Sequence, residues 1–165
     1  MGKMRNYRAY LSISASGPLL NVDSSEILNA TLTDMRPRAL AELAYTTADV
    51  DFLEGNWTSE NYDTAPNELH RRLTNPKLEE FRREMGTIQN WFSNFYDHDD
   101  WDGGCLTFTY AGHGRESDGA LVLEDGDITW ACFLNELLTL VPENNEHRLR
   151  VIILLDSCYS GSFLT

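Results

Sequence analysis

The segment Leu149–Leu155 is a nearly unbroken aliphatic run, and it constrains the fold more than any other part of the sequence. Its length suits a strand, and a strand without polar alternation is typical of a parallel sheet that is covered on both faces. Parallel strands need long crossover connections, which are usually helices. The run therefore predicts an α/β fold.

Two further strands are predicted. Cys105–Tyr110 is rich in β-branched and aromatic residues, and Tyr7–Ser14 alternates before a Ser/Gly/Pro segment that ends at Pro18. The acidic turn 124–127 contains Asp-Gly and predicts a small hairpin between apolar residues 120–123 and 128–130. Strand, helix and strand then follow in the order expected of a right-handed crossover.

The clearest helix is predicted from Pro76 to Tyr96, with Asn75 as its N-cap. Its apolar residues recur three or four positions apart: Leu78, Phe81, Met85, Ile88, Phe92 and Phe95. A second helix is predicted before Pro142, with one apolar face formed by Phe133, Leu134, Leu137, Leu138 and Val141. Between residues 19 and 67 the signal is weak, and only segments 39–44 and 47–53 suggest helix.

Composition narrows the choice of partners and compartment. The chain has 165 residues, enough for one domain, with 26 acidic and 13 basic residues and a net charge of −13. Such a field repels nucleic acid and anionic membranes, so neither is an expected partner. The three cysteines form no C-x-x-C pair, and no apolar stretch suggests a signal peptide or membrane span. We expect a reducing, cytoplasmic compartment.

Two short motifs directly follow the two best strands. Y-A-G-H-G places His113 after the strand at 105–110, and D-S-C-Y-S-G places Cys158 after the strand at 149–155. Ligands of open parallel sheets bind at the carboxyl ends of the strands, so the two side chains are predicted to converge. An imidazole beside a thiol can accept its proton, and the backbone N–H groups of Gly114 and Cys158 are candidate oxyanion donors.

These two motifs resemble those of caspase-like cysteine peptidases, most closely metacaspases and their bacterial relatives. The resemblance implies a caspase-like three-layer sandwich with a mostly parallel central sheet. It also implies that residues 1–165 are the large-subunit portion of one catalytic domain, ending just after the nucleophile. The small-subunit strands would then come from a separate chain or a cleaved product. A further partner is the protein or peptide substrate.

The resemblance also implies roles for individual residues. Cys158 is the nucleophile and His113 its partner, with Gly114 and Cys158 forming the oxyanion hole. Asp156, two residues before the nucleophile, would line an acidic S1 pocket that accepts Arg or Lys. A carboxylate at the end of an apolar strand is either solvated or paired with a cation, which agrees with this role. Asp49 or Asp51 would supply a second acidic residue.

No cofactor is expected for the chemistry, but many metacaspases are activated by calcium. Two acidic groups are candidates, although neither has EF-hand spacing: Asp118, Glu124, Asp125 and Asp127, and Asp97, Asp99, Asp100 and Asp102. His70, His98 and His147 are expected to face solvent, and Cys105 and Cys132 to be packing residues.

The leading hypothesis is a cysteine endopeptidase that cleaves after Arg or Lys in a processing, defence or cell-death pathway. The alternative is a catalytically inactive caspase-like scaffold or binding module. A flavodoxin-like binder is disfavoured, because Ser14–Pro18 is a weak match to a phosphate-binding loop.

Overall fold

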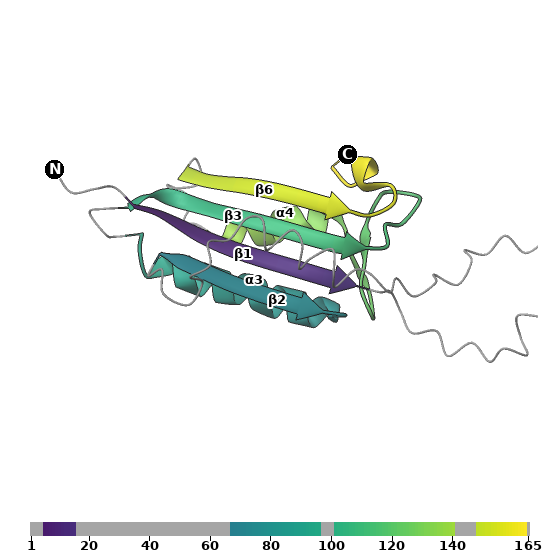
Figure 1. The fold of residues 1–165 in the computed structure, drawn as a ribbon, viewed down its shortest axis with the longest axis horizontal. Coiled ribbons are helices and arrows are strands. Elements are labelled where there is room, and N and C mark those ends of the chain that lie inside the picture. The colour runs from purple at the N-terminus through teal and green to yellow at the C-terminus, as the bar shows by residue number, and fades with distance from the viewer. Residues whose placement is uncertain (1–4, 16–66, 97–100, 141–147, 165) are drawn as a thin grey trace, which may run out of the picture.

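A computed structural model describes residues 5–15, 67–96, 101–140 and 148–164 of the chain. Its main sheet contains four strands: β1 (Arg5–Ala15), β2 (Glu68–Thr74), β3 (Trp101–Gly112) and β6 (Leu149–Asp156). They lie in the order β2-β1-β3-β6, and all neighbours are parallel (Figure 1). The predicted α/β class with a mostly parallel sheet is confirmed.

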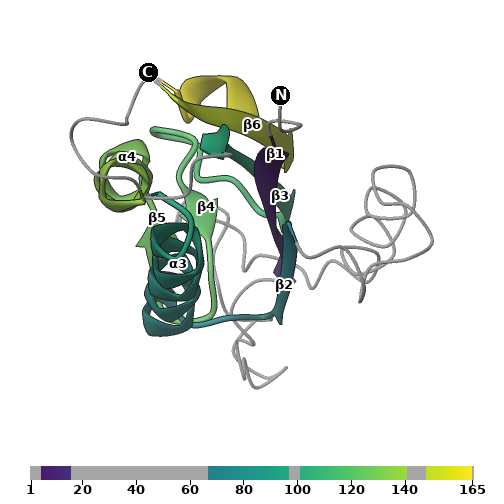
Figure 2. The same ribbon diagram turned by 90° about the vertical axis from the view of Figure 1, so that its left-hand side faces the viewer.

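Two helices, α3 (Leu78–Ser93) and α4 (Trp130–Thr139), pack on the same face of this sheet (Figure 2). The predicted apolar stripe of α3 is confirmed, since Phe81, Met85, Ile88 and Phe92 are fully buried. They belong to one buried cluster with alternate residues of the strands, including Leu11, Ile13, Leu106 and Phe108. Burial of each such side chain stabilises the folded state by roughly 1.5–3 kcal/mol. The interface between α3 and the sheet is therefore the hydrophobic core.

The start of α3 differs from the prediction. Its N-cap is Lys77, two residues later than predicted, because Asn75 adopts a left-handed conformation with φ 47°. Two carboxylates accept the first N–H groups: Glu80 bonds the N–H of Lys77 at 2.8 Å, and Asp125 bonds that of Leu78 at 2.8 Å. The helix start is therefore fixed partly by a residue 47 positions away in the chain.

The predicted hairpin is confirmed as the antiparallel pair β4 (Leu121–Val122) and β5 (Asp127–Ile128). Thr129 then caps α4 by accepting the N–H of Cys132 at 3.2 Å. The predicted apolar face of α4 is only partly correct. Phe133 and Leu137 are buried, but Leu134 and Leu138 are 39% and 56% exposed because they point away from the sheet.

Strand β2 was not predicted from the sequence. It carries charged residues and lies at one edge of the sheet, where pairing with β1 determines its structure. Its Arg71 forms an ion pair with Glu84 of α3 at 2.6 Å. His70 was expected to face solvent, but it is partly buried and stacks on Tyr10 with ring centroids 4.4 Å apart.

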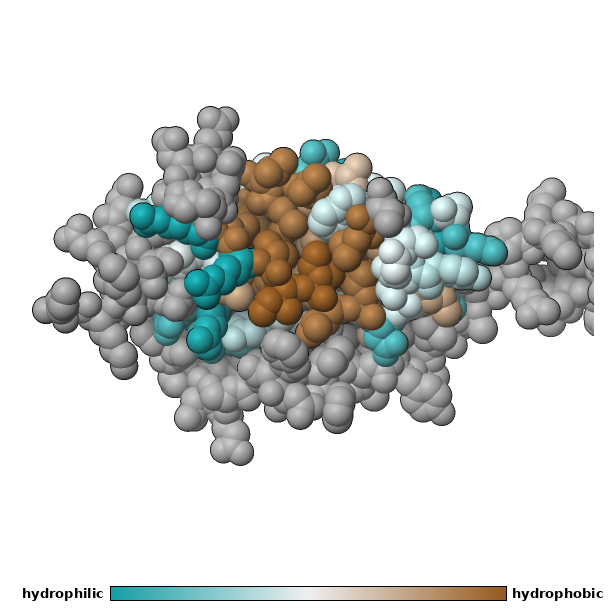
Figure 3. Space-filling view, turned by 90° about the horizontal axis from the view of Figure 1, so that it is seen from above, coloured by the Kyte–Doolittle hydropathy of each residue, from teal (hydrophilic) through white to brown (hydrophobic). Residues whose placement is uncertain are grey.

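Strand β6 lies at the other edge of the sheet. Its sequence predicted cover on both faces, whereas the helices in the described part of the chain cover one face. Ile152 is 38% exposed, and its strand neighbours Ile153 and Leu154 are only partly buried. Figure 3 shows an apolar surface over this strand. An exposed apolar edge strand is a site at which another strand can pair.

The predicted helical segments 39–44 and 47–53 lie outside the described residues, as do Asp97, Asp99, Asp100, His98, Val141, Pro142 and His147. Across the described ranges, no helix has the length and apolar character needed to span a membrane.

Candidate active site

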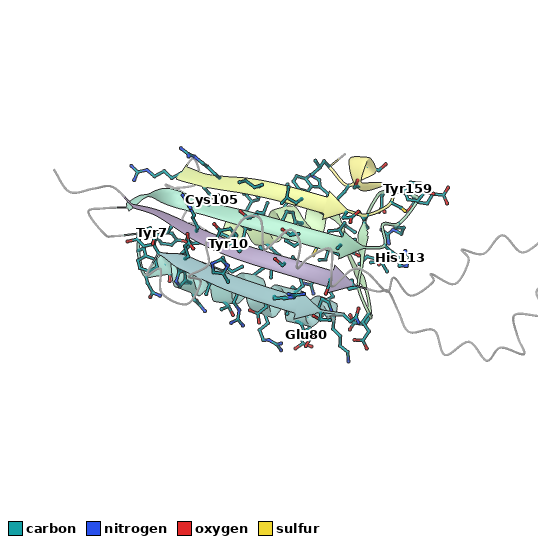
Figure 4. All side chains as sticks on the ribbon, viewed as in Figure 1. Tyr7, Tyr10, Glu80, Cys105, His113 and Tyr159 are labelled. Carbon is teal, nitrogen blue, oxygen red and sulfur yellow. The ribbon has the colours of Figure 1, made fainter. Side chains whose placement is uncertain are left out.

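The candidate site lies where β3 and β6 end side by side. Ala111 pairs with Asp156, the last residue of β6. His113 lies two residues after Ala111, and Cys158 lies two residues after Asp156. The two residues therefore follow paired strand positions at the same distance along the chain. The pairing brings the segments that carry these residues to the same edge of the sheet, as predicted. Figure 4 shows His113 and Tyr159, the neighbour of Cys158, at this end of the molecule.

The backbone after His113 packs directly against that of Cys158. A β-carbon on Gly114 would collide with the carbonyl oxygen of Cys158 and lie 3.0 Å from its carbonyl carbon. A second glycine, Gly119, has φ +68°, and a β-carbon there would lie 2.5 Å from the carbonyl oxygen of Tyr159 and from the N–H nitrogen of Phe163. Only residues without a side chain allow the loop 114–119 and the turn after β6 to approach so closely.

The turn that carries Cys158 is sharp. Tyr159 has left-handed dihedrals, φ 58° and ψ 18°, and precedes the short 3-10 helix η2 (Ser160–Ser162). A left-handed non-glycine residue costs about 1 kcal/mol, so packing elsewhere must hold it. Phe163 supplies such packing, because it is buried against Trp130 and Phe133 of α4. Cys158 itself is exposed.

His113 is half-buried, and its backbone is held from two sides. Its carbonyl oxygen accepts the N–H of Val122 at 3.0 Å and lies 2.9 Å from the hydroxyl oxygen of Tyr110. The same hydroxyl lies 2.8 Å from the carbonyl oxygen of Val122, so its single proton is donated to either acceptor. Burial raises the pKa of Tyr110, which keeps the hydroxyl a neutral donor.

Gly114 is suited to donate its N–H to a ligand. It forms an isolated antiparallel bridge with Leu121, but the two hydrogen bonds of that bridge come from its neighbours. Arg115 donates its N–H to Ala120, and Val122 donates to His113. Gly114 is thus at a non-hydrogen-bonded position, where its own N–H points away from the hairpin.

An ion network holds the loop after His113. Arg115 donates from Nε and Nη2 to the two carboxylate oxygens of Asp118, at 2.7 and 2.5 Å, and from Nη1 to Asp127 at 2.5 Å. The hydrogen bonds from Arg115 hold the pKa of Asp118 down at about 2. The sequence analysis did not identify Arg115, because an arginine three residues before an aspartate is only a weak indication of an ion pair.

The predicted S1 residues are only partly described. Asp156 ends β6 as an exposed carboxylate, close in sequence to Cys158. Asp49 and Asp51 lie outside the described residues. The structure therefore places one of the predicted acidic residues at the candidate site.

The first candidate calcium group has internal partners. Asp118 and Asp127 bind Arg115, and Asp125 caps α3. The described part of the chain contains no group of three or more His, Cys, Asp or Glu residues arranged to hold a metal ion. Most of the second group lies outside the described residues.

Comparison with known proteins gives no family. Neither a scan of protein-family models nor a search of curated proteins finds a match to this chain.

Proposed function

We propose that this chain is the catalytic portion of a caspase-like cysteine endopeptidase. One observation carries the proposal: the Gly114 backbone packs on that of Cys158, where two parallel strands end. This contact joins the segment that carries His113, the proposed base, to the segment that carries Cys158, the proposed nucleophile. The resemblance of the two motifs to caspase-like peptidases supports the same assignment.

In the proposed mechanism, Cys158 transfers its proton to His113 and attacks the scissile carbonyl carbon. A sulfur–carbon bond forms, and the carbonyl oxygen becomes an oxyanion. His113 then protonates the leaving amine as the carbon–nitrogen bond breaks, which leaves a thioester. Water hydrolyses the thioester with His113 as base, releasing the carboxylate product and regenerating the thiol.

The backbone N–H groups of Gly114 and Cys158 would bind the oxyanion. The outward direction of the Gly114 N–H supports this role. Backbone donors are fixed before reaction and need no reorganisation, and one such donor is worth about 10²–10³ in kcat. Gly114 therefore contributes both close packing and a donor.

We propose Arg or Lys at P1, with Asp156 in the S1 pocket and Asp49 or Asp51 as a second acidic residue. The exposure of Asp156 supports its assignment, because an accessible carboxylate can pair with a substrate cation. The net charge of −13 favours the approach of basic substrates.

The finer fold assignment is a caspase-like three-layer sandwich completed by a small-subunit segment that pairs with β6. The edge position of β6 and the exposure of Ile152 support this partner. We place the enzyme in the cytoplasm, in a processing, defence or cell-death pathway. The odd number of cysteines suits that reducing compartment.

A fluorogenic peptide panel with Arg, Lys, Asp or Leu at P1 tests the proposal. The protein is assayed as the 165-residue chain and as isolated from its own cells, each with calcium and with a chelator. We expect turnover after Arg and Lys that disappears in Cys158→Ala and falls in Asp156→Asn. Turnover only after Asp or Leu would overturn the S1 assignment, and a Cys158→Ala variant that remains active would overturn the nucleophile.

The second candidate function is an inactive binding module. The exposed apolar side chains of α4 and β6, Leu134, Leu138 and Ile152, favour it. The same panel distinguishes the two functions, because a binding module cleaves none of the peptides in either form of the protein.

A further inference from the structure

We infer that Arg115 is a positioning residue that holds the proposed oxyanion donor of Gly114 against Cys158. This inference rests on the proposed function. Arg115 directly follows Gly114, and it connects two parts of the fold: Asp118 in its own loop and Asp127 in β5. Every hydrogen bond described for its guanidinium is to a carboxylate of these two residues.

The loop that Arg115 closes is short and cross-linked. Asp118 also accepts the N–H of Ala120 at 3.1 Å, and Gly119 donates its N–H to the carbonyl oxygen of Arg115 at 2.7 Å. The pairing of Arg115 with Asp118 is bidentate, which fixes direction as well as distance. The backbone of residues 115–120 is therefore tied to the guanidinium through several hydrogen bonds.

Both ends of this loop contact the turn of the nucleophile. Gly114 packs on the carbonyl group of Cys158, and Gly119 packs on Tyr159 and Phe163. The bond from Arg115 to Asp127 holds the loop to the hairpin, which is joined in turn to α3 through Asp125. Backbone hydrogen bonds from Arg115 to Ala120 and from Val122 to His113 hold the loop to β4. Loss of the guanidinium would remove the remaining tie to β5 and allow the Gly114 N–H to shift relative to the Cys158 thiol.

A role in global stability does not account for this network. The side chains of Arg115 and Asp118 are 40% and 46% exposed, and that of Asp127 is 25% exposed. Ion pairs that water reaches contribute little to the free energy of folding. A displacement of about 1 Å near reacting atoms, by contrast, can lower a rate about 10²-fold. We therefore expect loss of the network to lower the rate of hydrolysis more than it lowers the stability of the fold.

The experiment compares two reactions of the same thiol. Peptide hydrolysis needs the oxyanion donors, whereas alkylation of Cys158 by iodoacetamide forms a sulfur–carbon bond as iodide leaves and creates no oxyanion. Arg115→Lys, Arg115→Met and Asp127→Asn are compared with the wild type. Arg82→Lys is the matched control, because Arg82 is an exposed arginine that pairs with Glu136 at 3.8 Å, away from this loop.

We expect the Arg115 variants to lower kcat about 10- to 100-fold with KM changed less than about 2-fold, and Asp127→Asn to lower kcat less. The rate of Cys158 alkylation, followed by peptide mass, should stay at the wild-type value in all variants. Unchanged kcat in Arg115→Lys and Arg115→Met would overturn the inference. Loss of hydrolysis and alkylation together would also overturn it, because that result indicates general disruption of the site. Inactivity of the wild type would instead reject the proposed function, and the inference with it.

Discussion

The α-carbon of Gly114 lies against the carbonyl group of Cys158 so closely that no side chain fits between them. This contact joins the segment after β3 to the turn after β6. It predicts that Gly114→Ala separates the two segments and destabilises the protein by about 1–3 kcal/mol, the usual effect of overpacking. Peptide turnover should fall at least about 100-fold, because the oxyanion donor moves. Denaturant unfolding and kcat measure the two effects.

The control for Gly114→Ala is Gly86→Ala. Gly86 lies within α3, and a β-carbon there would meet no atom within 4 Å. Alanine should stabilise the helix by about 0.5–1 kcal/mol and leave turnover unchanged. Equal effects of the two substitutions would contradict the close contact at Gly114.

The low pKa of Asp118 predicts a stability that depends on acid pH. Its hydrogen bonds from Arg115 lower the pKa from 3.8 to about 2 in the folded protein. Folding therefore favours the ionised carboxylate. Its contribution to the free energy of unfolding is fully present above pH 4 and is lost as the pH falls through about 2. The melting temperature of the wild type should exceed that of Asp118→Asn above pH 4, and the difference should shrink towards pH 2. Glu116 is an exposed neighbour, so Glu116→Gln controls for the loss of one negative charge. A melting-temperature difference between the wild type and Asp118→Asn that persists at pH 2 would contradict the low pKa assigned to Asp118.

The hydroxyl of Ser157 is buried and has no hydrogen-bond partner within the described structure. An unsatisfied buried hydroxyl is unfavourable, so Ser157→Ala should raise the free energy of unfolding by about 1 kcal/mol. Ser93→Ala is the control, because the exposed Ser93 hydroxyl donates to the carbonyl oxygen of Asn90 at 2.7 Å and water can replace it; the free energy of unfolding should change by less than about 0.5 kcal/mol. Destabilisation by Ser157→Ala would show that the hydroxyl has a partner, such as a bound water.

The ion pair between Arg71 and Glu84 should stabilise the folded protein more than exposed ion pairs do, because the Glu84 side chain is only 8% exposed. Arg71→Met leaves that carboxylate buried without its partner and should destabilise the protein by about 2 kcal/mol, less than for a fully buried pair. A double-mutant cycle with Glu84→Met should give a coupling energy of about 1–2 kcal/mol. The exposed pair Arg83–Glu80, at 3.6 Å, should give about 0.5 kcal/mol or less. Equal couplings would contradict the role of burial.

The sequence was sufficient to predict the elements whose signals are local. The aliphatic run of β6, the apolar stripe of α3 and the Asp-Gly turn between β4 and β5 each depend on neighbouring residues alone. Strand β2 could not be found in this way, because Glu68–Thr74 has no apolar alternation of its own and depends on pairing with β1.

Residues for a candidate site could be proposed from the sequence, but their arrangement in space could not. Both motifs follow strands, so the placement of His113 and Cys158 at strand ends could be inferred from the sequence. The pairing of Ala111 with Asp156 is a long-range register that no local pattern specifies. The same holds for the partners of Arg115, since only the folded hairpin brings Asp127 to the guanidinium.

The most direct test of the central claim is covalent labelling with a peptidyl acyloxymethyl ketone that carries Arg at P1. The account predicts one adduct per chain, located on Cys158 by peptide mass, and a labelling rate at least about 100-fold lower in His113→Ala. Cys105 and Cys132, which are partly buried, should remain unlabelled. Equal labelling of all three thiols, or a rate that does not depend on His113, would contradict the proposal that these two residues form a catalytic dyad.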